Sequence, residues 1–242
     1  MSDHLKRLNS PSGWRIARKT KKFVVKTSPG PHNGNAMPLG VWLRDHMGLA
    51  LNSKEVKKIL TDRSVIVNGK VCTNMKLGIG IFDIVSIPKT DKHYRILRNK
   101  KGDYVSVPIS AEDAQTQLCK ISNKTIVKDG KVQLNLRHGA NIVVDSQEYK
   151  PKDSIVVKLT GDERFKIIDH FAFAEGNCAM VTGGKHSGKV GQITKIEVIP
   201  ACIENRVFLK DIKSGEEFDT VENYIFMVGR STPAVSEWGI EA

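Results

Sequence analysis

Between residues 38 and 61 the apolar side chains recur at the three- and four-residue spacing of amphipathic helices. The first stripe contains Leu39, Trp42, Leu43 and Met47, and the second contains Val56, Ile59 and Leu60. Pro38 suits the first position of the first helix, Gly48 is expected to end it, and Ser53 can cap the second helix. The second helix would place three lysines opposite its apolar stripe: Lys54, Lys57 and Lys58.

After residue 64 the pattern changes to short runs of β-branched residues separated by turns. Ser64–Val67 and Lys70–Cys72 flank Asn68-Gly69, a strong hairpin signal, and a further strand is expected from Ile79 to Ile87. Similar runs fill residues 96–172 and 173–228, at a spacing that suggests small barrels. The sequence therefore predicts an α+β, multidomain protein, in which a small helix-plus-hairpin module precedes mostly-β, barrel-like domains.

Composition divides the chain into four parts. Residues 1–37 form a basic arm with few large apolar anchors, and residues 38–88 form the helix-plus-hairpin module. Pro88 begins a polar linker that runs from Lys89 to Arg95. Residues 89–172 are predicted to form a central β domain, and residues 173–242 a last β domain with a C-terminal tail. Because the arm has so few anchors, we expect it to be disordered in the free protein and to become ordered on a nucleic acid.

The charge of the chain is concentrated in its N-terminal part. Residues 1–100 carry a net charge of +14 and residues 101–242 carry −2, which together give the +12 of the whole chain. Like charges at this density repel one another unless a partner neutralises them. The division therefore predicts a polyanionic partner for the N-terminal part, and the alternative is a basic surface that is only solvated.

The segment from Leu39 to Ile87 resembles the small RNA-binding module named after bacterial ribosomal protein S-four. The resemblance lies in Leu39, Leu43, Leu49-Ala50, Ser53, Val56, Ile59-Leu60, Val65, Val67-Asn68-Gly69-Lys70-Val71 and Asp83-Ile84-Val85. Lys54 stands where the module often has Arg, which removes a bidentate phosphate contact, and Ile81-Phe82-Asp83 stands where Gly-Asp is usual. Basic side chains on such a rigid scaffold contact phosphates and read RNA shape more than its sequence.

A glycine-rich stretch, residues 183–190, comes one residue short of a nucleotide-binding P-loop. A P-loop needs a hydroxyl after its lysine to bind Mg²⁺, which Val190 lacks, and it opens a helix, whereas residues 190–199 are strand-like. The longer stretch Gly176–Ile193 resembles a KOW motif, a β-turn-β element of ribosomal proteins and transcription factors, with Asn177 in place of the usual Asp. The resemblance leaves two possibilities open, a local RNA contact through Lys185 and Lys189 or a purely structural hairpin.

The sequence contains no recognisable catalytic or metal-binding pattern. Its seven histidines show neither H-x-x-x-H nor H-x-H, and no serine lies in a G-x-S-x-G turn. The cysteines are interpreted as buried thiols, although a zinc site built from distant residues stays open: Cys72, Cys119, Cys178 and Cys202. We therefore expect no enzyme, metal or cofactor, and without a run of eighteen apolar residues we expect no membrane partner.

The order of arm, module, central β domain and KOW motif resembles the S-four-e family of archaeal and eukaryotic small-subunit ribosomal proteins. Further matching segments are His4-Leu5-Lys6-Arg7-Leu8, Gly30-Pro31-His32, Val56-Lys57-Lys58-Ile59, Met180-Val181-Thr182-Gly183-Gly184 and Asn223-Tyr224-Ile225-Phe226-Met227-Val228. Eukaryotic members carry a basic extension beyond the KOW domain, and this chain resembles the archaeal form. The resemblance implies a structural protein of the small subunit of the cytoplasmic ribosome, with ribosomal RNA and neighbouring ribosomal proteins as its partners.

The candidate RNA-binding residues are Lys6, Arg7, Arg15, Arg18, Lys19, Lys21, Lys22, Lys26, Arg44, Lys54, Lys57, Lys58, Lys70, Lys185 and Lys189. Two other functions are considered. Some pseudouridine synthases begin with the same module, but their catalytic Asp follows Arg-Leu, and no Arg-Leu-Asp occurs here. A KOW-containing transcription elongation factor need not carry the Leu39–Ile87 module, which this chain has.

Overall fold

The structure is a computed structural model, and it describes residues 4–30, 32, 36–127, 130–145, 148–161, 163–200, 203–230 and 232. The chain divides into two compact units, residues 1–97 with 103–114 and residues 98–102 with 115–242. Three predicted features lie wholly or partly outside the described residues: the turn-rich end of the arm at residues 31 and 33–35, Cys202, and the C-terminal tail from residue 233.

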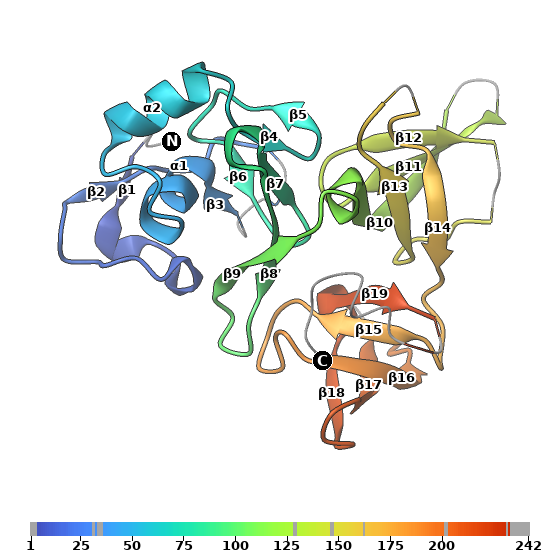
Figure 1. The fold of residues 1–242 in the computed structure, drawn as a ribbon. Coiled ribbons are helices and arrows are strands. Elements are labelled where there is room, and N and C mark those ends of the chain that lie inside the picture. Colours follow the sequence, from blue (N-terminus) through green and yellow to red (C-terminus); the bar gives the residue numbers. More distant parts are fainter. Residues whose placement is uncertain are drawn as a thin grey trace. The chain divides into compact units, whose positions relative to one another are not determined.

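The first unit combines short helices with small antiparallel sheets (Figure 1). Its elements are β1 (Leu5–Lys6), η1 (Arg7–Asn9), η2 (Ser12–Trp14), β2 (Phe23–Val24), β3 (Met37–Pro38), α1 (Leu39–Val41), η3 (Trp42–His46), α2 (Ser53–Thr61), β4 (Ile66–Val67), β5 (Lys70–Val71), β6 (Gly78–Ile79), β7 (Ile84–Ile87), η4 (Pro88–Thr90), β8 (Lys92–Arg98) and β9 (Tyr104–Ile109). One sheet has the order β5-β4-β7-β8-β9, while β1 pairs with β2 and β3 pairs with β6.

Both predicted helices are present, and α2 has the predicted amphipathic character. It buries Val56 and Leu60 and leaves its three lysines exposed. Its cap is Asn52 and not the predicted Ser53, because the Asn52 Oδ1 accepts from the backbone N–H groups of Lys54 and Glu55 at 2.9 and 3.0 Å. The Glu55 carboxylate accepts in return from the Asn52 side chain at 2.7 Å, so the first turn is closed from both sides.

The predicted hairpin at Asn68-Gly69 is confirmed by the pairing of Val67 with Lys70. Asn68 and Gly69 have φ of 47° and 74°, the left-handed conformation that a two-residue hairpin of this kind needs. Phe82, which stands where the RNA-binding module usually has Gly, is also left-handed, with φ of 66°. Its ring is buried, and this burial offsets the strain that a side chain meets in that conformation.

The predicted linker between residues 89 and 95 is wrong, because these residues lead into and form β8, which pairs with β7. Two contacts fix β8 and β9 to the helices: the Trp42 Nε1 donates to the Ser106 Oγ at 2.8 Å, and the Trp42 and Tyr94 rings meet edge to face. Arg95 is only 1% exposed, and burial lowers its pKa to about 10, against the opposing effect of Asp113. In the sequence this strand resembles a linker, because residues 89–95 are mainly polar and the burial of their arginine is not visible there.

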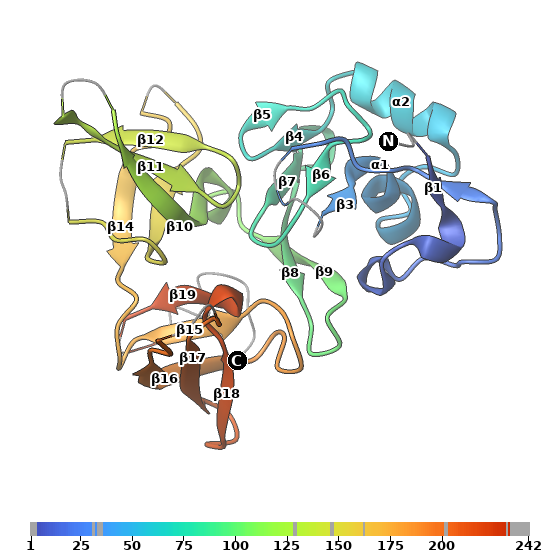
Figure 2. The same ribbon diagram turned by 180° about the vertical axis from the view of Figure 1, so that it is seen from behind.

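The prediction of an arm without a fixed position also differs from the structure. Trp14, Ile16 and Val24 are buried in the same core as Leu39 and Trp42. Strand β1 pairs with β2, Leu5 lying opposite Val24, and both views show β1 beside α1 (Figures 1 and 2). Leu5 and Val25 pack against the same core, and the helices supply most of the apolar surface that these few side chains cover.

In the residues of the second unit that the structure describes, the strands form two five-stranded antiparallel sheets. The first sheet, with the order β12-β11-β10-β13-β14, consists of β10 (Thr116–Ile126), β11 (Val132–Leu136), β12 (Asn141–Val144), β13 (Ser154–Lys158) and β14 (Ile167–Phe171). The second, with the order β18-β17-β16-β15-β19, consists of β15 (Cys178–Val181), β16 (Val190–Glu197), β17 (Arg206–Asp211), β18 (Glu217–Val221) and β19 (Ile225–Gly229). The predominance of β structure in this half is as predicted. Cys119 and Cys178 in this unit, and Cys72 in the first unit, are buried thiols, also as predicted.

A buried lysine joins the two sheets of the second unit. Lys120 on β10 is 6% exposed, and its Nζ donates to the carbonyl oxygens of Ile225 at 2.6 Å and Glu222 at 3.4 Å. Glu222 lies in η7 (Glu222–Tyr224), the turn before β19. Burial, and then the nearby Arg137, lower the pKa of Lys120 to about 8, although Glu222 acts in the opposite direction.

Because of Lys120, we predict that the second unit becomes more stable as pH rises from 8 to 10.5. In this interval the unfolded chain still binds the proton that the folded chain has released, so stability increases with pH, by about 3 kcal/mol in total. Urea unfolding measured across this range in the wild type and in Lys120→Met would test it. The curve of Lys120→Met should lack this rise, and two parallel curves would contradict the assignment.

Candidate nucleic-acid interface

The lysines of α2 form an exposed row on a firmly held helix. Val56 and Leu60 fix the opposite face in the core, so Lys54, Lys57 and Lys58 keep their charged groups in water. Lys70 is also exposed, at the start of β5 after the Asn68-Gly69 turn. Phosphate recognition needs cations that are solvated, accessible and presented by a rigid scaffold, and these four residues meet that requirement.

The basic residues of the N-terminal segment lie mainly in one loop, residues 15–22, between two buried anchors. Trp14 and Ile16 hold its beginning and Val24 lies just beyond its end. The exposed cations of the segment are Lys6, Arg15, Arg18, Lys19, Lys21 and Lys22, whereas Lys26 is half-buried. Arg15 keeps 59% of its side chain exposed despite an ion pair with Asp103 at 3.4 Å. The loop therefore presents a dense positive charge with limited freedom to move.

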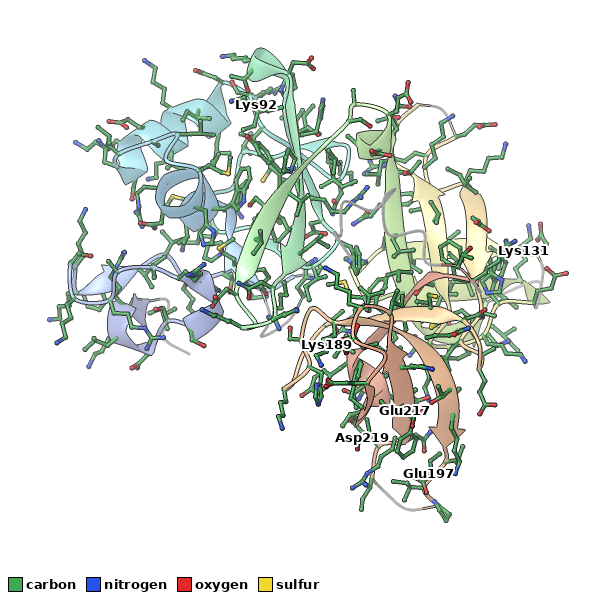
Figure 3. All side chains as sticks on the ribbon, turned by 60° about the horizontal axis from the view of Figure 1, so that its bottom comes forward. Lys92, Lys131, Lys189, Glu197, Glu217 and Asp219 are labelled. Carbon is green, nitrogen blue, oxygen red and sulfur yellow. The ribbon has the colours of Figure 1, made fainter. Side chains whose placement is uncertain are left out.

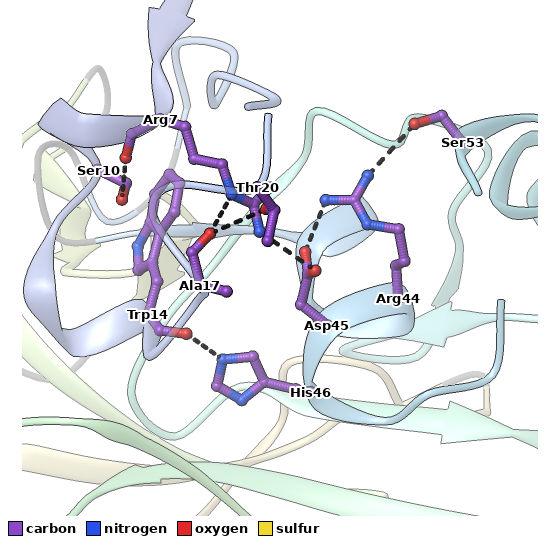
Figure 4. A network of polar contacts seen from close by, with 9 residues as sticks. All are labelled: Arg7, Ser10, Trp14, Ala17, Thr20, Arg44, Asp45, His46 and Ser53. Atoms are coloured by element: carbon purple, nitrogen blue, oxygen red, sulfur yellow. Dashed lines mark hydrogen bonds and ion pairs between the residues drawn. The ribbon is translucent and has the colours of Figure 1, made fainter. Parts of the chain in front are cut away.

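Arg7 is a predicted RNA-binding residue that the structure places in the interior. Its side chain is 5% exposed, its Nε donates to the Ala17 carbonyl, and its Nη2 lies 3.6 Å from the Asp45 carboxylate (Figure 4). The prediction for Arg7 does not fit this geometry, because a guanidinium with these partners is not available to a phosphate. Its role is structural, since it joins the N-terminal segment to η3.

Asp45 connects Arg7 with Arg44, the next predicted RNA-binding residue. One carboxylate oxygen faces Arg7, and the other accepts from the Arg44 Nη2 at 2.6 Å (Figure 4). The Arg44 Nη1 donates to the Ser53 Oγ at 3.3 Å, at the start of α2. The Asp45 carboxylate thus orients a half-buried arginine between the N-terminal segment and α2. Asp45 is not among the predicted site residues, because a single acid in a basic region has no recognisable pattern.

His46, the residue after Asp45, makes a further contact with the N-terminal segment. The ring Nε2 of His46 lies 2.6 Å from the carbonyl oxygen of Trp14, and it donates there in the tautomer that carries its proton on Nε2 (Figure 4). Two consecutive residues of η3, Asp45 and His46, therefore both hold the N-terminal segment. This segment is fixed by polar contacts as well as by its buried side chains.

In the second unit, the glycine-rich stretch joins β15 to β16 as a hairpin in which Met180 pairs with Val190. Because Val190 begins a strand, no helix N-terminus is available to hold a nucleotide phosphate here, as predicted. Lys185 is exposed at the turn. Lys189 is more enclosed: its Nζ lies 3.8 Å from Asp211 and 5.0 Å from the centre of the Phe218 ring.

Comparisons with known proteins agree with this architecture. A family model described as Ribosomal family S4e matches residues 90–164, and a model described as the RS4NT (NUC023) domain matches residues 1–34. The chain is 56% identical to small ribosomal subunit protein eS4 of Methanospirillum hungatei over 241 residues, 100% of both chains. It belongs to the S4e family of ribosomal proteins.

Other members of the S4e family extend the similarity. The eS4 protein of Archaeoglobus fulgidus is 44% identical over 229 residues, 94% of this chain and 93% of the relative. The crystal structure of the 30S ribosomal protein S4e from Thermoplasma acidophilum has a TM-score of 0.68 at 27% identity, and the match covers 81% of this chain and 96% of that one. In the part of the chain that the structure describes, no helix is long and apolar enough to span a membrane.

We predict that Asp45→Asn releases the N-terminal segment in the free protein. The substitution replaces the carboxylate that faces the buried Arg7 with a neutral amide, which should cost about 1–2 kcal/mol, because the pair is only partly desolvated and Arg7 keeps its hydrogen bond to Ala17. Limited trypsin digestion followed by mass spectrometry should show faster cleavage within residues 15–22. Asp91→Asn, which removes a carboxylate that is 94% exposed, is the matched control. Equal cleavage rates in both variants would contradict a structural role for Asp45.

Proposed function

We propose that this S4e protein binds small-subunit ribosomal RNA mainly through the basic surface of its first unit. The observation that carries the proposal is the row of exposed lysines on α2, held by a buried opposite face. The exposed cations of the loop at residues 15–22 add a second phosphate-binding segment in the same unit. Both lie within the residues that carry the net charge of +14.

The S4e family consists of structural proteins of the small ribosomal subunit, so the chain is a structural constituent of the cytoplasmic ribosome and not an enzyme. Neither a pseudouridine synthase nor a transcription elongation factor finds support among the relatives described above. The affinity would come chiefly from counterion release, because each phosphate neutralised by Lys or Arg frees condensed cations from the RNA. Such binding reads the shape of the RNA backbone and makes the affinity strongly salt-dependent.

The second unit, by this proposal, contributes a scaffold and a more local contact. The hairpin of β15 and β16 has the β-turn-β arrangement of a KOW motif, and we propose that its sheet is a KOW domain. The net charge of −2 over residues 101–242 makes an extended RNA surface unfavourable there. The remaining surface of this unit is then available to neighbouring ribosomal proteins.

Replacing Lys54, Lys57 and Lys58 with Ala should weaken binding to small-subunit ribosomal RNA without unfolding the first unit. The three side chains are exposed and lie opposite the buried stripe, so the core is untouched. If each lysine meets one phosphate, the slope of log K against log salt flattens by about 2–3. Filter binding at several salt concentrations gives the slope, and circular dichroism verifies the fold.

A charge-matched control separates specific contacts from a general loss of charge. Lys76, Lys89 and Lys92 are exposed in the same unit but lie outside α2 and outside the predicted set. Their replacement with Ala removes the same charge and should change the slope by less than 1. Equal slopes for the two triple variants would mean that α2 makes no defined contact and that only the net charge of the unit matters.

A further inference from the structure

Three loops of the second unit meet around a small open cavity that the sequence did not reveal. The cavity has a volume of about 40 Å³ and is lined by Lys100, Gly188, Lys189, Val190, Asp211, Ile212 and Lys213. These residues come from segments far apart in sequence: residues 98–102, the turn before β16, and the turn between β17 and β18. The volume gives room for roughly three water-sized groups, comparable to the oxygens of one phosphate.

The chemistry of the lining favours an anion. Lys100, Lys189 and Lys213 bring three positive charges to the cavity, and Asp211 brings one negative charge, so the lining has a net charge of +2. The three lysines that line one small cavity repel one another, and an anion bound there would offset this repulsion. A partly enclosed site with a net charge of +2 is better suited to bind a single compact anion than an open, solvated surface is.

Asp211 acts as a support for the lysines. Its Oδ1 accepts from the backbone N–H of Lys213 at 3.0 Å, and its Oδ2 lies 3.8 Å from the Lys189 Nζ. The Phe218 ring faces the same Nζ, with 5.0 Å between Nζ and ring centre. Lys189 is therefore held in one place, and Lys100 and Lys213, both exposed residues, supply the cations that can close on a ligand.

Gly188 allows the loops to approach one another this closely. Its φ is +77°, and a Cβ at this position would lie 2.8 Å from the carbonyl oxygen of Arg98. Any other residue would push residues 98–102 away and separate Lys100 from Lys189. The glycine thus has a role beyond turning the hairpin, since it lets the backbone that carries Lys100 lie against the turn.

The distribution of charge along the sheet of β15 to β19 leaves the end that carries the cavity accessible to a polyanion. Glu197 ends β16, whereas Lys189 immediately precedes that strand, so the two lie at opposite ends of the sheet (Figure 3). The labelled acids of the edge strand β18 are Glu217 and Asp219 (Figure 3), and neither lines the cavity. Asp211 is the one acid among the residues that line the cavity, and it lies beside Lys189, so a phosphate entering the cavity meets a lining with a net charge of +2.

We propose that the cavity lined by Lys100, Lys189 and Lys213 holds one backbone phosphate of the RNA. The proposal rests on the proposed RNA-binding function and makes it more specific, because it adds two residues, Lys100 and Lys213, that no sequence pattern selected. It also distinguishes Lys189, which lines the cavity, from Lys185, which does not.

The test uses the full chain and small-subunit ribosomal RNA. Lys100→Ala, Lys213→Ala and the double variant leave Lys189 with its partners Asp211 and Phe218, so the fold is expected to persist, and thermal unfolding verifies it. Because both lysines serve the same phosphate, the double variant should flatten the log–log salt slope by about 1. Its loss of affinity should also be smaller than the product of the two single losses, since the two residues share one ligand.

The matched control is the double variant Lys195→Ala with Lys210→Ala, which removes two exposed lysines of the same sheet that do not line the cavity. A slope change equal to that of the control, or a change of about 2 with independent effects, would overturn the proposal. So would stabilisation by inorganic phosphate that depends on Lys100 and Lys213 while the RNA slope stays unchanged, because the cavity would then serve a free anion. If the wild type itself fails to bind the RNA, the proposed function fails, which is a separate outcome.

Discussion

Cations that are to meet RNA phosphates have to stay in water, so they cannot themselves anchor the segment that carries them. This constraint governs the first unit. Trp14, Ile16 and Val24 supply the anchoring for the N-terminal segment by joining the core of the helices. If these side chains did not reach that core, the repulsion among the neighbouring lysines and arginines would keep the segment extended. The position of the basic surface therefore depends on a few apolar contacts.

Carboxylates near the basic residues position cations more than they neutralise them. Asp45 lies between Arg7 and Arg44 and fixes both, while the lysines of α2 remain exposed. Asp211 has the corresponding place in the second unit, where it contacts Lys189 and the backbone of Lys213. In each case one acid orients basic groups and leaves the region with a net positive charge, which is the arrangement that a phosphate ligand requires.

Features that depend on neighbouring residues in sequence were predicted well. The α2 helix and its lysine row follow from a 3.6-residue period, and the Asn68-Gly69 hairpin follows from the left-handed conformation that these residues accept. The predicted linker at residues 89–95 was wrong, because Arg95 is buried in strand β8 and an arginine is rarely buried. The prediction that the N-terminal segment has no fixed position was also wrong, because its apolar anchors are few and the surface that they cover belongs to helices that follow it in the sequence.

The sequence by itself determined the charge division, the two helices, the β character of the second half, the absence of a P-loop and the exposed lysines of α2. Each is a property of composition or of local periodicity. Only the tertiary structure decided that Arg7 is internal, that Asp45 orients Arg44, and that Lys100, Lys189 and Lys213 surround one cavity. Apart from the pair of neighbours Arg44 and Asp45, these contacts join residues tens of positions apart, and their distances depend on how the sheets and loops pack, which local sequence does not encode.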